Sequence, residues 1–444
     1  MQMGGGDWGI RALSLRSAQI RDALASQDYT YTAVTMGPDG EIHQVIEVIE
    51  DVLVVPEDPT AAIAALADPS TKIVSMTITE KGYCHNPADG QLRLDDPDIA
   101  HDLAHPDTPR TAPGLIVYAL AARRAAGNLP FTVLSCDNLP QNGTLTRQII
   151  LNFAKAVDPE LAEWIATHGR FPTTMVDRIT PATTPADIDR LAEDTGYSDP
   201  ASVFHEPFKQ WVIEDNFVED ARPDWDAAGA QFVADVTPFE MMKLRCLNGT
   251  HSALAYLGYL AGFETVAEAM NDKTLATFID HLWRDEIIPS FAPPQDTDLT
   301  AYCAALKTRY QNPNIQHRTW QIAMDGSQKL PQRILGTISD NLAAGRPITG
   351  LTRVVAAWMI YVGGTRLDGS PIDVRDPLAD LLRDISNSHL DAVAKVTGFL
   401  NVGDVFNPDL AAHPQFREAV LTAYQHLTKR GILPTLSHAC SNPT

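Results

Sequence analysis

The sequence predicts two domains, an α/β domain over residues 1–235 and a mainly α-helical domain over residues 236–444. Three observations lead to this prediction. Extended and helical patterns alternate through the first half, strand patterns almost vanish after Pro238, and 444 residues are enough for two or three domains. The boundary is expected near Asp235, between the last extended run and the first long helical segment.

The first half alternates between the two-residue period of strands and the longer period of helices. Runs rich in β-branched and apolar residues predict strands at residues 8–15, 29–35, 42–55, 72–79, 131–135 and 231–236. Helical patterns predict helices at residues 17–26, 59–67 and 112–126. Because strands and helices alternate at these lengths, we expect a parallel sheet with helices on its faces.

The second half contains helical patterns almost exclusively. The predicted helices span residues 253–261, 266–270, 275–283, 301–310, 351–362, 377–385 and 414–430. No internal repeat or low-complexity linker interrupts them, and residues 293–298 (PPQDTD) form a loop.

The composition is that of an acidic globular protein, with a net charge of −22 and a pI of about 4.9. Such a chain is a poor partner for nucleic-acid phosphates or an anionic membrane surface. The five cysteines are widely spaced and include no CxxC pair, which argues against a zinc site or a disulfide framework. Without a membrane-span-length apolar run or a signal-peptide pattern, a cytoplasmic location is expected.

Residues 238–262 (PFEMMKLRCLNGTHSALAYLGYLAG) combine the pattern of a buried helix with several polar groups. At about 100° per residue, one side of the helix, within about 140°, carries Glu240, Lys243, Asn248 and His251. Burying an amine, an amide and an imidazole together is costly unless they bond to one another or to a ligand. Desolvation also lowers the pKa of a lysine and makes it a usable base.

A structural interpretation of the same segment stays open. Lys243 can extend its amine to water, and His251 can be a hydrogen-bonded core histidine. The spacing alone does not distinguish a ligand-binding site from a structural helix whose polar side chains are hydrogen-bonded within the protein.

Six ordered blocks extend this pattern along nearly the whole chain. They are TITEKGYC, SCDNLPQNG, FPTTMVDRITP, EPFKQWVIED, residues 238–262 and HRTWQIAMDGSQKLPQR. Together they resemble the mannitol dehydrogenase family of long-chain polyol dehydrogenases, and SLRS and WQIAMDGSQKLP are most similar to its fructuronate reductase (D-mannonate oxidoreductase) branch. The resemblance implies a Rossmann-like first domain, NAD as the cofactor and hydride transfer at a CH–OH carbon.

The resemblance also implies catalytic roles. Lys243 matches the acid/base lysine of the family, and Asn248 and Asn138 match its pair of alkoxide-binding amides. His251 is expected to hold a substrate hydroxyl or to orient the lysine. From the residues alone, the preferred interpretation of Asn138 is a turn residue within NLPQNG.

Two acidic residues are expected near the substrate. Asp177 matches a substrate-site aspartate of the family, and its alternatives are an ion pair with Arg178 or a helix cap. Glu240 is expected to bond Lys243 or to control the release of its proton.

A further substrate contact is expected from Lys329, which matches a second substrate lysine of the family. It would meet the carboxylate of a uronate or a sugar hydroxyl, and Arg318 and Arg333 are alternative cations for the same charge. Gln321 stands where the mannitol-specific branch tends to carry an arginine, which weakens the mannitol interpretation.

A glycine pattern occurs at the start of the chain, where Gly4, Gly6 and Gly9 spell GxGxxG. We reject it as a phosphate turn, because no strand precedes it and residues 8–15 read as a strand, not a helix. The opening strand–turn–helix unit of the family, with its glycine turn and FHRAH-like stretch, is therefore expected to be missing. Either the true start lies upstream, which we favour, or the chain is shortened.

Cofactor contacts are expected from Arg16, Thr79 and Asn138. An acid at the end of the strand at residues 8–15 would bind the ribose hydroxyl of NAD, but Arg16 occurs there and leaves NADP open. No metal is expected, since His205, Glu206 and His251 lack ligand spacing.

The sequence as a whole predicts an NAD-dependent oxidoreductase that interconverts D-fructuronate and D-mannonate. The alternatives are a mannitol or polyol 2-dehydrogenase, and an inactive remnant or sugar-acid binder without a pyrophosphate turn. The expected partner is a small sugar acid or polyol, with no nucleic acid and no membrane, and the expected state is a monomer or a small homo-oligomer.

Overall fold

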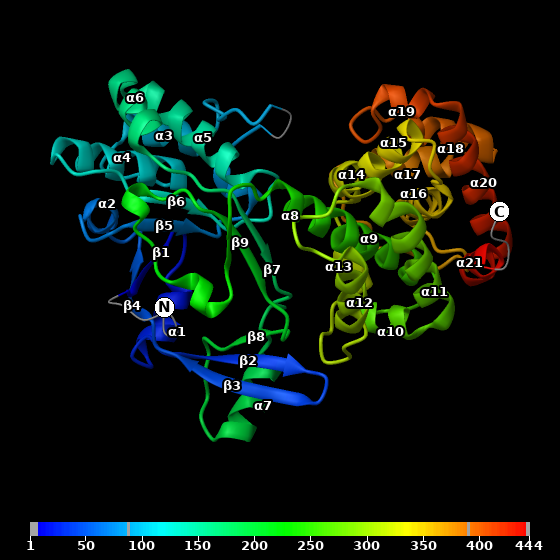
Figure 1. Cartoon of the computed structure of the whole chain (residues 1–444), viewed down its shortest axis with the longest axis horizontal. Coiled ribbons are helices and arrows are strands. Elements are labelled where there is room, and N and C mark those ends of the chain that lie inside the picture. Colours follow the sequence, from blue (N-terminus) through cyan, green and yellow to red (C-terminus); the bar gives the residue numbers. More distant parts are fainter. Residues whose placement is uncertain (1–7, 87–88, 389–390, 441–444) are drawn as a thin grey trace. The chain divides into compact units, whose positions relative to one another are not determined.

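The computed structural model describes residues 8–86, 89–388 and 391–440. The chain divides into two compact units, Met1–Thr237 and Pro238–Thr444 (Figure 1). Each unit is described by itself. In the part of the chain that the structure describes, no helix is both long enough and apolar enough to cross a membrane.

Two parallel strand pairs lie at the centre of the first unit. β1 (Ile10–Ser14) pairs with β4 (Ile49–Val54), and β5 (Ile73–Met76) pairs with β6 (Thr132–Ser135). Among the described residues, no strand is hydrogen-bonded to both pairs. The pairs share one apolar core, in which α2 (Pro59–Ala67) packs against α4 (Ala112–Ala125).

The prediction of a wholly parallel sheet is wrong for the remaining strands. β2 (Tyr31–Gly37) forms an antiparallel hairpin with β3 (Gly40–Ile46), because only two residues join them, too few for a crossover. β2 also pairs in parallel with β8 (Val203–His205). In a further sheet, β9 (Gln210–Glu214) is antiparallel to β7 (Thr174–Asp177) and parallel to the last strand, β10 (Gln231–Val233).

Five of the α-helices described in the first unit begin where the sequence supplies an N-cap and a proline. Asp58 accepts a hydrogen bond from the Ala61 N–H (2.8 Å) before Pro59, which occupies the first turn of α2. An Asp or Thr cap with a proline within the next two residues likewise opens four other helices. The remaining helices of this unit are α1 (Gln19–Ala25), α3 (Pro97–Ala104), α5 (Asn142–Val157), α6 (Pro159–His168) and α7 (Pro185–Thr195).

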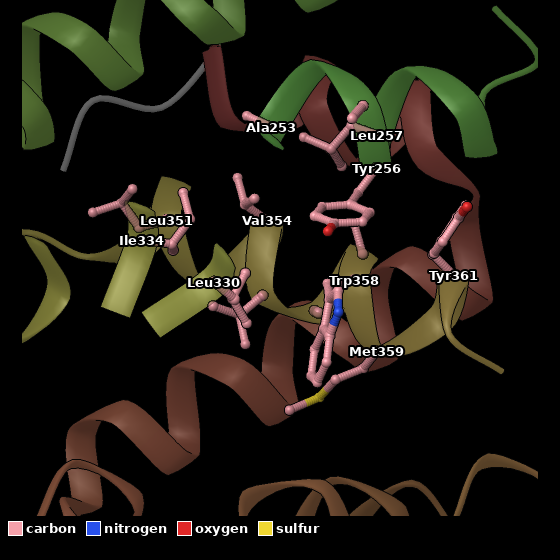
Figure 2. Close-up of a cluster of buried hydrophobic side chains, with 14 of the residues drawn as sticks. Ala253, Tyr256, Leu257, Leu330, Ile334, Leu351, Val354, Trp358, Met359 and Tyr361 are labelled. Atoms are coloured by element: carbon pink, nitrogen blue, oxygen red, sulfur yellow. The ribbon is translucent and has the colours of Figure 1, made fainter. Parts of the chain in front are cut away.

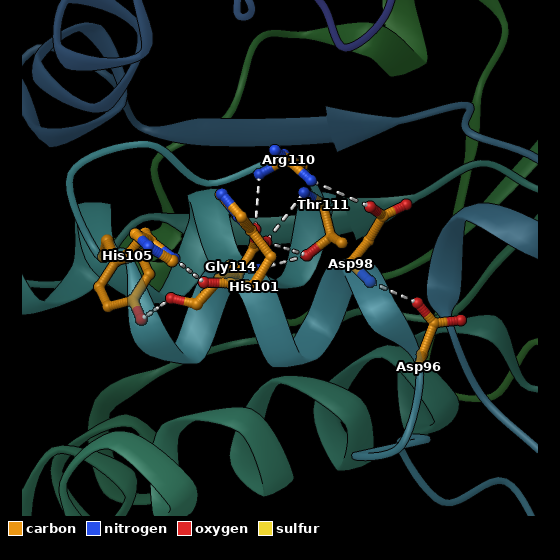
Figure 3. A network of polar contacts seen from close by, with 9 residues as sticks. Asp96, Asp98, His101, His105, Arg110, Thr111 and Gly114 are labelled. Atoms are coloured by element: carbon orange, nitrogen blue, oxygen red, sulfur yellow. Dashed lines mark hydrogen bonds and ion pairs between the residues drawn. The ribbon is translucent and has the colours of Figure 1, made fainter.

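A buried carboxylate joins α3 to the start of α4 (Figure 3). Asp102, which is 0% exposed, accepts hydrogen bonds from the Arg110 N–H (2.7 Å), the Thr111 N–H (2.9 Å) and the Thr111 hydroxyl (2.6 Å). Thr111 in turn caps α4 through the Gly114 N–H (3.1 Å). These bonds satisfy the carboxylate, so the network explains the packing of α3 and α4 and requires no ligand.

The elements described in the second unit are all helices, joined by loops, as predicted. Its α-helices are α8 (Thr237–Met242), α9 (Thr250–Ala253), α10 (Val266–Asn271), α11 (Lys273–His281), α12 (Leu299–Tyr310), α13 (Thr319–Ala323), α14 (Gly326–Leu330), α15 (Gly336–Ala343), α16 (Thr349–Tyr361), α17 (Ala379–Asn387), α18 (Ala392–Leu400), α19 (Pro408–Ala412), α20 (Pro414–Arg430) and α21 (Ile432–Cys440). Wider π-helical turns occur at Lys243–Gly249, Leu254–Gly258, Leu282–Ile287 and Pro331–Leu335.

The core of the second unit surrounds α16, which is buried along nearly its whole length and packs against α20. Figure 2 shows Trp358 of α16 beside Tyr256 from the π-helical segment Leu254–Gly258. Gly326 permits this arrangement, because a Cβ there would lie 2.4 Å from the Tyr256 hydroxyl and 2.7 Å from Trp358 Nε1. The start of α14, and with it Lys329, is therefore held against the core.

Candidate functional site

The lysine segment does not continue as the regular α-helix that its periodicity predicts. α8 changes at Lys243 into a π-helix that runs to Gly249. In an α-helix, residues five apart lie about 140° apart, whereas the i→i+5 bonds of a π-helix bring them toward the same side. The π-helical turn therefore places Lys243 and Asn248 closer together around the helix axis than a regular α-helix would. Single π-turns of this kind occur frequently at functional sites.

Side chains from elsewhere in the unit stabilise the irregular backbone. The Cys246 carbonyl accepts hydrogen bonds from the Thr250 hydroxyl (2.6 Å) and Trp283 Nε1 (2.9 Å). The Leu247 carbonyl accepts one from the Tyr310 hydroxyl (3.0 Å). Because these carbonyls are buried, each extra donor lowers the cost of the wider turn.

The polar residues on this segment differ in burial. Asn248 and His251 are buried, with 8% and 6% exposure, whereas Glu240 and Lys243 are half-buried. A buried amide beside a partly accessible amine can present both a neutral N–H donor and a proton-transfer group to a bound ligand.

His251 is held in its neutral form. Burial lowers its pKa well below the ordinary value, and the neighbouring His317 and Arg333 lower it further. Its ring centroid lies 4.8 Å from that of Tyr310 and 5.3 Å from that of His317. Its Nε2 has no hydrogen-bond partner within the described chain. A neutral imidazole with an unused buried nitrogen is suited to bind a hydroxyl.

Lys329 lies on α14 in the same unit and is half-buried. Its Nζ donates to the Met324 carbonyl (2.6 Å) and, more weakly, to the Ile322 carbonyl (3.5 Å). Burial lowers its pKa, and the charge of Arg333 lowers it further. Its charge also lowers the pKa of His317, whose ring meets that of His251, a grouping that the sequence alone did not show.

In the first unit, an unpredicted carboxylate connects the ends of β5 and β6. Asp137 accepts hydrogen bonds from the Ile78 N–H (2.9 Å), the Thr79 N–H (3.0 Å) and the Tyr83 hydroxyl (2.7 Å). Asn138, which is exposed, follows it directly. Asp137 thus brings two predicted cofactor residues, Thr79 and Asn138, to the carboxyl ends of two neighbouring parallel strands, where α/β sheets bind ligands.

The backbone of Thr79 is strained. Its φ of 62° and ψ of 162° lie in a region that a β-branched residue rarely adopts. The consecutive N–H groups of Ile78 and Thr79 both donate to Asp137 and hold the chain as it enters this turn. Strain of this kind is typical of ligand-binding positions, but the sequence pattern TITEK carries no signal for it.

Asn142 is a second residue that sequence reasoning missed. It is 0% exposed, donates to the carbonyls of Asp137 and Thr174 (3.0 Å each), and accepts from the Thr174 N–H (2.9 Å). It connects the loop after β6 to β7, which ends at the predicted substrate residue Asp177 (4% exposed). The proposed alternative partner of Asp177, Arg178, donates to the Phe208 carbonyl (3.1 Å).

The remaining expectations concern the start of the chain and metals. Arg16 is exposed and follows β1. Gly4 and Gly6 lie outside the described residues, and the residues after Gly9 form the strand β1, which agrees with the rejection of a phosphate turn there. Among the described residues, no group of three or more His, Cys, Asp or Glu side chains is arranged to hold a metal ion.

Two family models match the chain along most of its length. The mannitol dehydrogenase Rossmann domain matches residues 1–227, and the mannitol dehydrogenase C-terminal domain matches residues 235–428. The chain belongs to the mannitol dehydrogenase family. The predicted family and the predicted combination of a Rossmann-like and a helical domain are thereby confirmed, and the chain is an oxidoreductase that acts on a CH–OH group.

Members of the mannitol dehydrogenase family with different substrates are similar to this chain. It is 46% identical over 429 residues to the D-mannonate oxidoreductase of Escherichia coli strain K12. The aligned region covers 96% of this chain and 88% of that protein. It is 40% identical over 442 residues to the mannitol 2-dehydrogenase of Aspergillus terreus, with 97% and 86% coverage.

Solved structures of the family are similar throughout the fold. The Pseudomonas fluorescens mannitol 2-dehydrogenase, in a ternary complex with NAD and D-mannitol, has a TM-score of 0.86 at 40% identity, covering 98% of this chain and 89% of that one. A substrate-free D-sorbitol dehydrogenase has a TM-score of 0.89 at 31% identity, with 97% and 89% coverage.

Proposed function

We propose that this member of the mannitol dehydrogenase family is an NAD-dependent oxidoreductase that interconverts D-fructuronate and D-mannonate. The main observation is the group of polar side chains on the irregular helix after α8, comprising Lys243, Asn248 and His251. The 46% identity to a D-mannonate oxidoreductase supports the choice of substrate.

Lys243 is the proposed acid and base. In the direction of ketone reduction, its ammonium gives a proton to the carbonyl oxygen as that oxygen gains negative charge. The amides of Asn248 and, by resemblance, Asn138 donate N–H bonds to the same oxygen without adding a charge. In the reverse direction, the neutral amine of Lys243 takes the proton of the alcohol. His251 holds a neighbouring hydroxyl through its neutral ring.

The nicotinamide cofactor supplies or accepts the hydride when it is bound. The residues at the carboxyl ends of β5 and β6 fit such a cofactor, since Asp137 bonds the N–H of the exposed Thr79 and is followed directly by the exposed Asn138. Arg16, the exposed cation after β1, is the proposed contact at the ribose end.

Polyol oxidation is the second candidate. It is favoured by the 40% identity to a mannitol 2-dehydrogenase whose structure contains NAD and D-mannitol. Asp177, buried at the end of β7, and Glu240, half-buried on α8, are proposed substrate-site residues for either substrate.

The two candidates are separated by a matched substrate pair. D-fructuronate and D-fructose differ only at C6, which is a carboxylate in the first and a hydroxymethyl group in the second. We expect NADH-dependent reduction of D-fructuronate with a kcat/KM at least about 100-fold above that of D-fructose. A preference for D-fructose would select polyol oxidation. Failure of the folded chain to bind NADH in a calorimetric titration would contradict both and favour an inactive binder.

The conformation of Thr79 offers a separate test of the cofactor site. Asp137→Asn leaves one carbonyl oxygen to serve three donors, so the strained turn relaxes. Because such strain is worth about 1–3 kcal/mol, we expect the Kd for NADH to rise about tenfold.

The control for this prediction is Tyr83→Phe. It removes the hydroxyl bond to Asp137 and keeps both backbone bonds, so the NADH Kd is expected to change by less than about threefold. An unchanged Kd in a folded Asp137→Asn protein, or an equal change in both variants, would show that the turn has no part in cofactor binding.

A further inference from the structure

Two basic residues in the second unit share one helical face and have no acidic ion-pair partner among the described residues. Lys329 lies on α14, and Arg333 follows one turn later in the π-helical segment Pro331–Leu335. Both are half-buried, and neither forms an ion pair with any carboxylate among the described side chains. Burial of unpaired charge is unfavourable, so a pair of this kind is normally matched by an anion.

Arg333 is the less well satisfied of the two. Its Nη1 makes one long hydrogen bond, 3.5 Å to the hydroxyl of Ser252, next to His251. Burial lowers the pKa of Arg333, although a guanidinium remains charged. Its planar group carries several N–H donors in the geometry that matches both oxygens of a carboxylate.

Two neutral histidines lie near these cations. Burial and the charge of Lys329 lower the pKa of His317, as burial, His317 and Arg333 lower that of His251. The two rings meet edge to face with centroids 5.3 Å apart. His317 Nδ1 and His251 Nε2 are both buried without a hydrogen-bond partner within the described chain. The region therefore has two positive charges and two unused ring nitrogens.

The nearest carboxylates are occupied elsewhere or lie beyond contact. Asp376 accepts hydrogen bonds from the Ser327 N–H (2.8 Å), the Ser327 hydroxyl (2.6 Å) and the Leu378 N–H (2.9 Å). Asp325 raises the pKa of Lys329 only through its charge and forms no ion pair with it within 4.0 Å. Neither carboxylate neutralises Arg333.

We propose that Arg333, together with Lys329, binds the carboxylate of the substrate, with His317 as a neutral hydrogen-bonding partner, and so selects sugar acids over neutral polyols. The proposal rests on the function proposed above, because it assigns the acid end of the substrate to the unit that contains Lys243. It gives Arg333 and His317 roles in specificity, whereas proton transfer stays with Lys243.

The test uses the same matched ketoses. In Arg333→Gln, we expect kcat/KM for D-fructuronate to fall at least about 30-fold, mainly through KM, while that for D-fructose changes by less than about threefold. Lys329→Met is expected to act in the same direction. Arg333→Lys keeps a charge but loses the two-pronged geometry, and we expect it to recover only part of the loss. Should Arg333→Gln fail to fold, these two variants carry the test.

Arg318→Gln tests the rival cation. Arg318 is exposed on the same stretch of chain, and its removal is expected to leave the preference for D-fructuronate within about threefold of the wild type. The proposal is overturned if Arg318→Gln, and not Arg333→Gln, abolishes the preference. Equal losses on both ketoses in Arg333→Gln would also overturn it, because they indicate a structural role.

A binding measurement separates this proposal from the proposed reaction. If the wild type reduces neither ketose, calorimetric titration with D-mannonate and D-mannitol still compares an acid with its neutral counterpart. We expect D-mannonate to bind the wild type at least about tenfold more tightly than D-mannitol, and Arg333→Gln to remove this difference. Equal affinities in the wild type, or an unaltered D-mannonate affinity in the variant, would overturn the acid site.

Discussion

Replacement of Lys243 by alanine is expected to lower kcat about 1,000-fold for either ketose at neutral pH. The reason is chemical. The half-buried Lys243 is the first residue of the π-helical turn that also contains Asn248, and the proposed reaction needs a proton at the carbonyl oxygen as the hydride arrives. General acid–base groups contribute about 100- to 10,000-fold, and water is a poor substitute in a site that excludes it.

Cofactor binding distinguishes loss of chemistry from loss of structure. Because Thr79 and Asn138, the proposed cofactor contacts, lie in the first unit, we expect the Kd of Lys243→Ala for NADH to stay within about threefold of the wild type. Added primary amines are expected to restore part of kcat. The measurements are steady-state kinetics and a fluorescence titration with NADH.

Two other lysine variants sharpen the test. Lys243→Arg keeps a positive charge but cannot release a proton near neutral pH, so it is expected to be nearly as slow as the alanine variant. Lys273→Ala removes an exposed lysine at the start of α11 and is expected to leave kcat unchanged. A Lys243→Ala enzyme whose kcat stays within tenfold of the wild type would refute the acid/base role.

A single added methyl group at Gly143 is expected to destabilise the first unit by about 3 kcal/mol. Gly143 lies in the first turn of α5, and a Cβ there would be 2.4 Å from the Phe171 carbonyl oxygen and 2.6 Å from the Thr173 nitrogen. Both are backbone atoms, so the helix and the segment leading into β7 must separate. Asn142, whose three bonds join these same parts, would lose its geometry as well.

The measurement for Gly143→Ala is urea unfolding, with hydrogen exchange of α5 to assign the transition to the first unit. Gly403→Ala is the control, because the added Cβ would meet no heavy atom within 4 Å, and its stability is expected to stay within about 0.5 kcal/mol of the wild type. An unchanged midpoint for Gly143→Ala would mean that α5 and the segment before β7 tolerate separation. Weaker NADH binding is expected to accompany the loss, since the Asp137 carbonyl accepts a hydrogen bond from the Asn142 side-chain amide.

The sequence pattern predicted helices and strands well where residues close in sequence determine them. The run Asp58-Pro59 predicts the start of α2, because the carboxylate caps the helix and the proline needs no hydrogen bond there. The residues 8–15 were correctly read as a strand and not as the helix of a phosphate turn. The antiparallel pairing of β7 with β9 was not predictable, since residues 178–209 separate the two strands.

The candidate site was predicted only in part for the same reason. Lys243, Asn248 and His251 share one segment, so their proximity follows from sequence spacing, although the spacing assumed a regular helix. The π-helical turn at Lys243–Gly249 is stabilised by hydrogen bonds from the Tyr310 hydroxyl and the Trp283 indole. These residues are distant in sequence, so the periodicity of the segment does not indicate them.

By itself, the sequence determined the family, the helical second half and the identity of the candidate acid/base, because ordered blocks and local periodicity are properties of the chain. Only the tertiary structure decided that Asp137 holds Thr79 in a strained turn and that Lys329 and Arg333 form no ion pair with a carboxylate in the part of the chain that the structure describes. The physical reason is that pairing and desolvation depend on which distant side chains converge. Whether a charged side chain is paired within the protein or available to a ligand can be judged only when its neighbours in space are known.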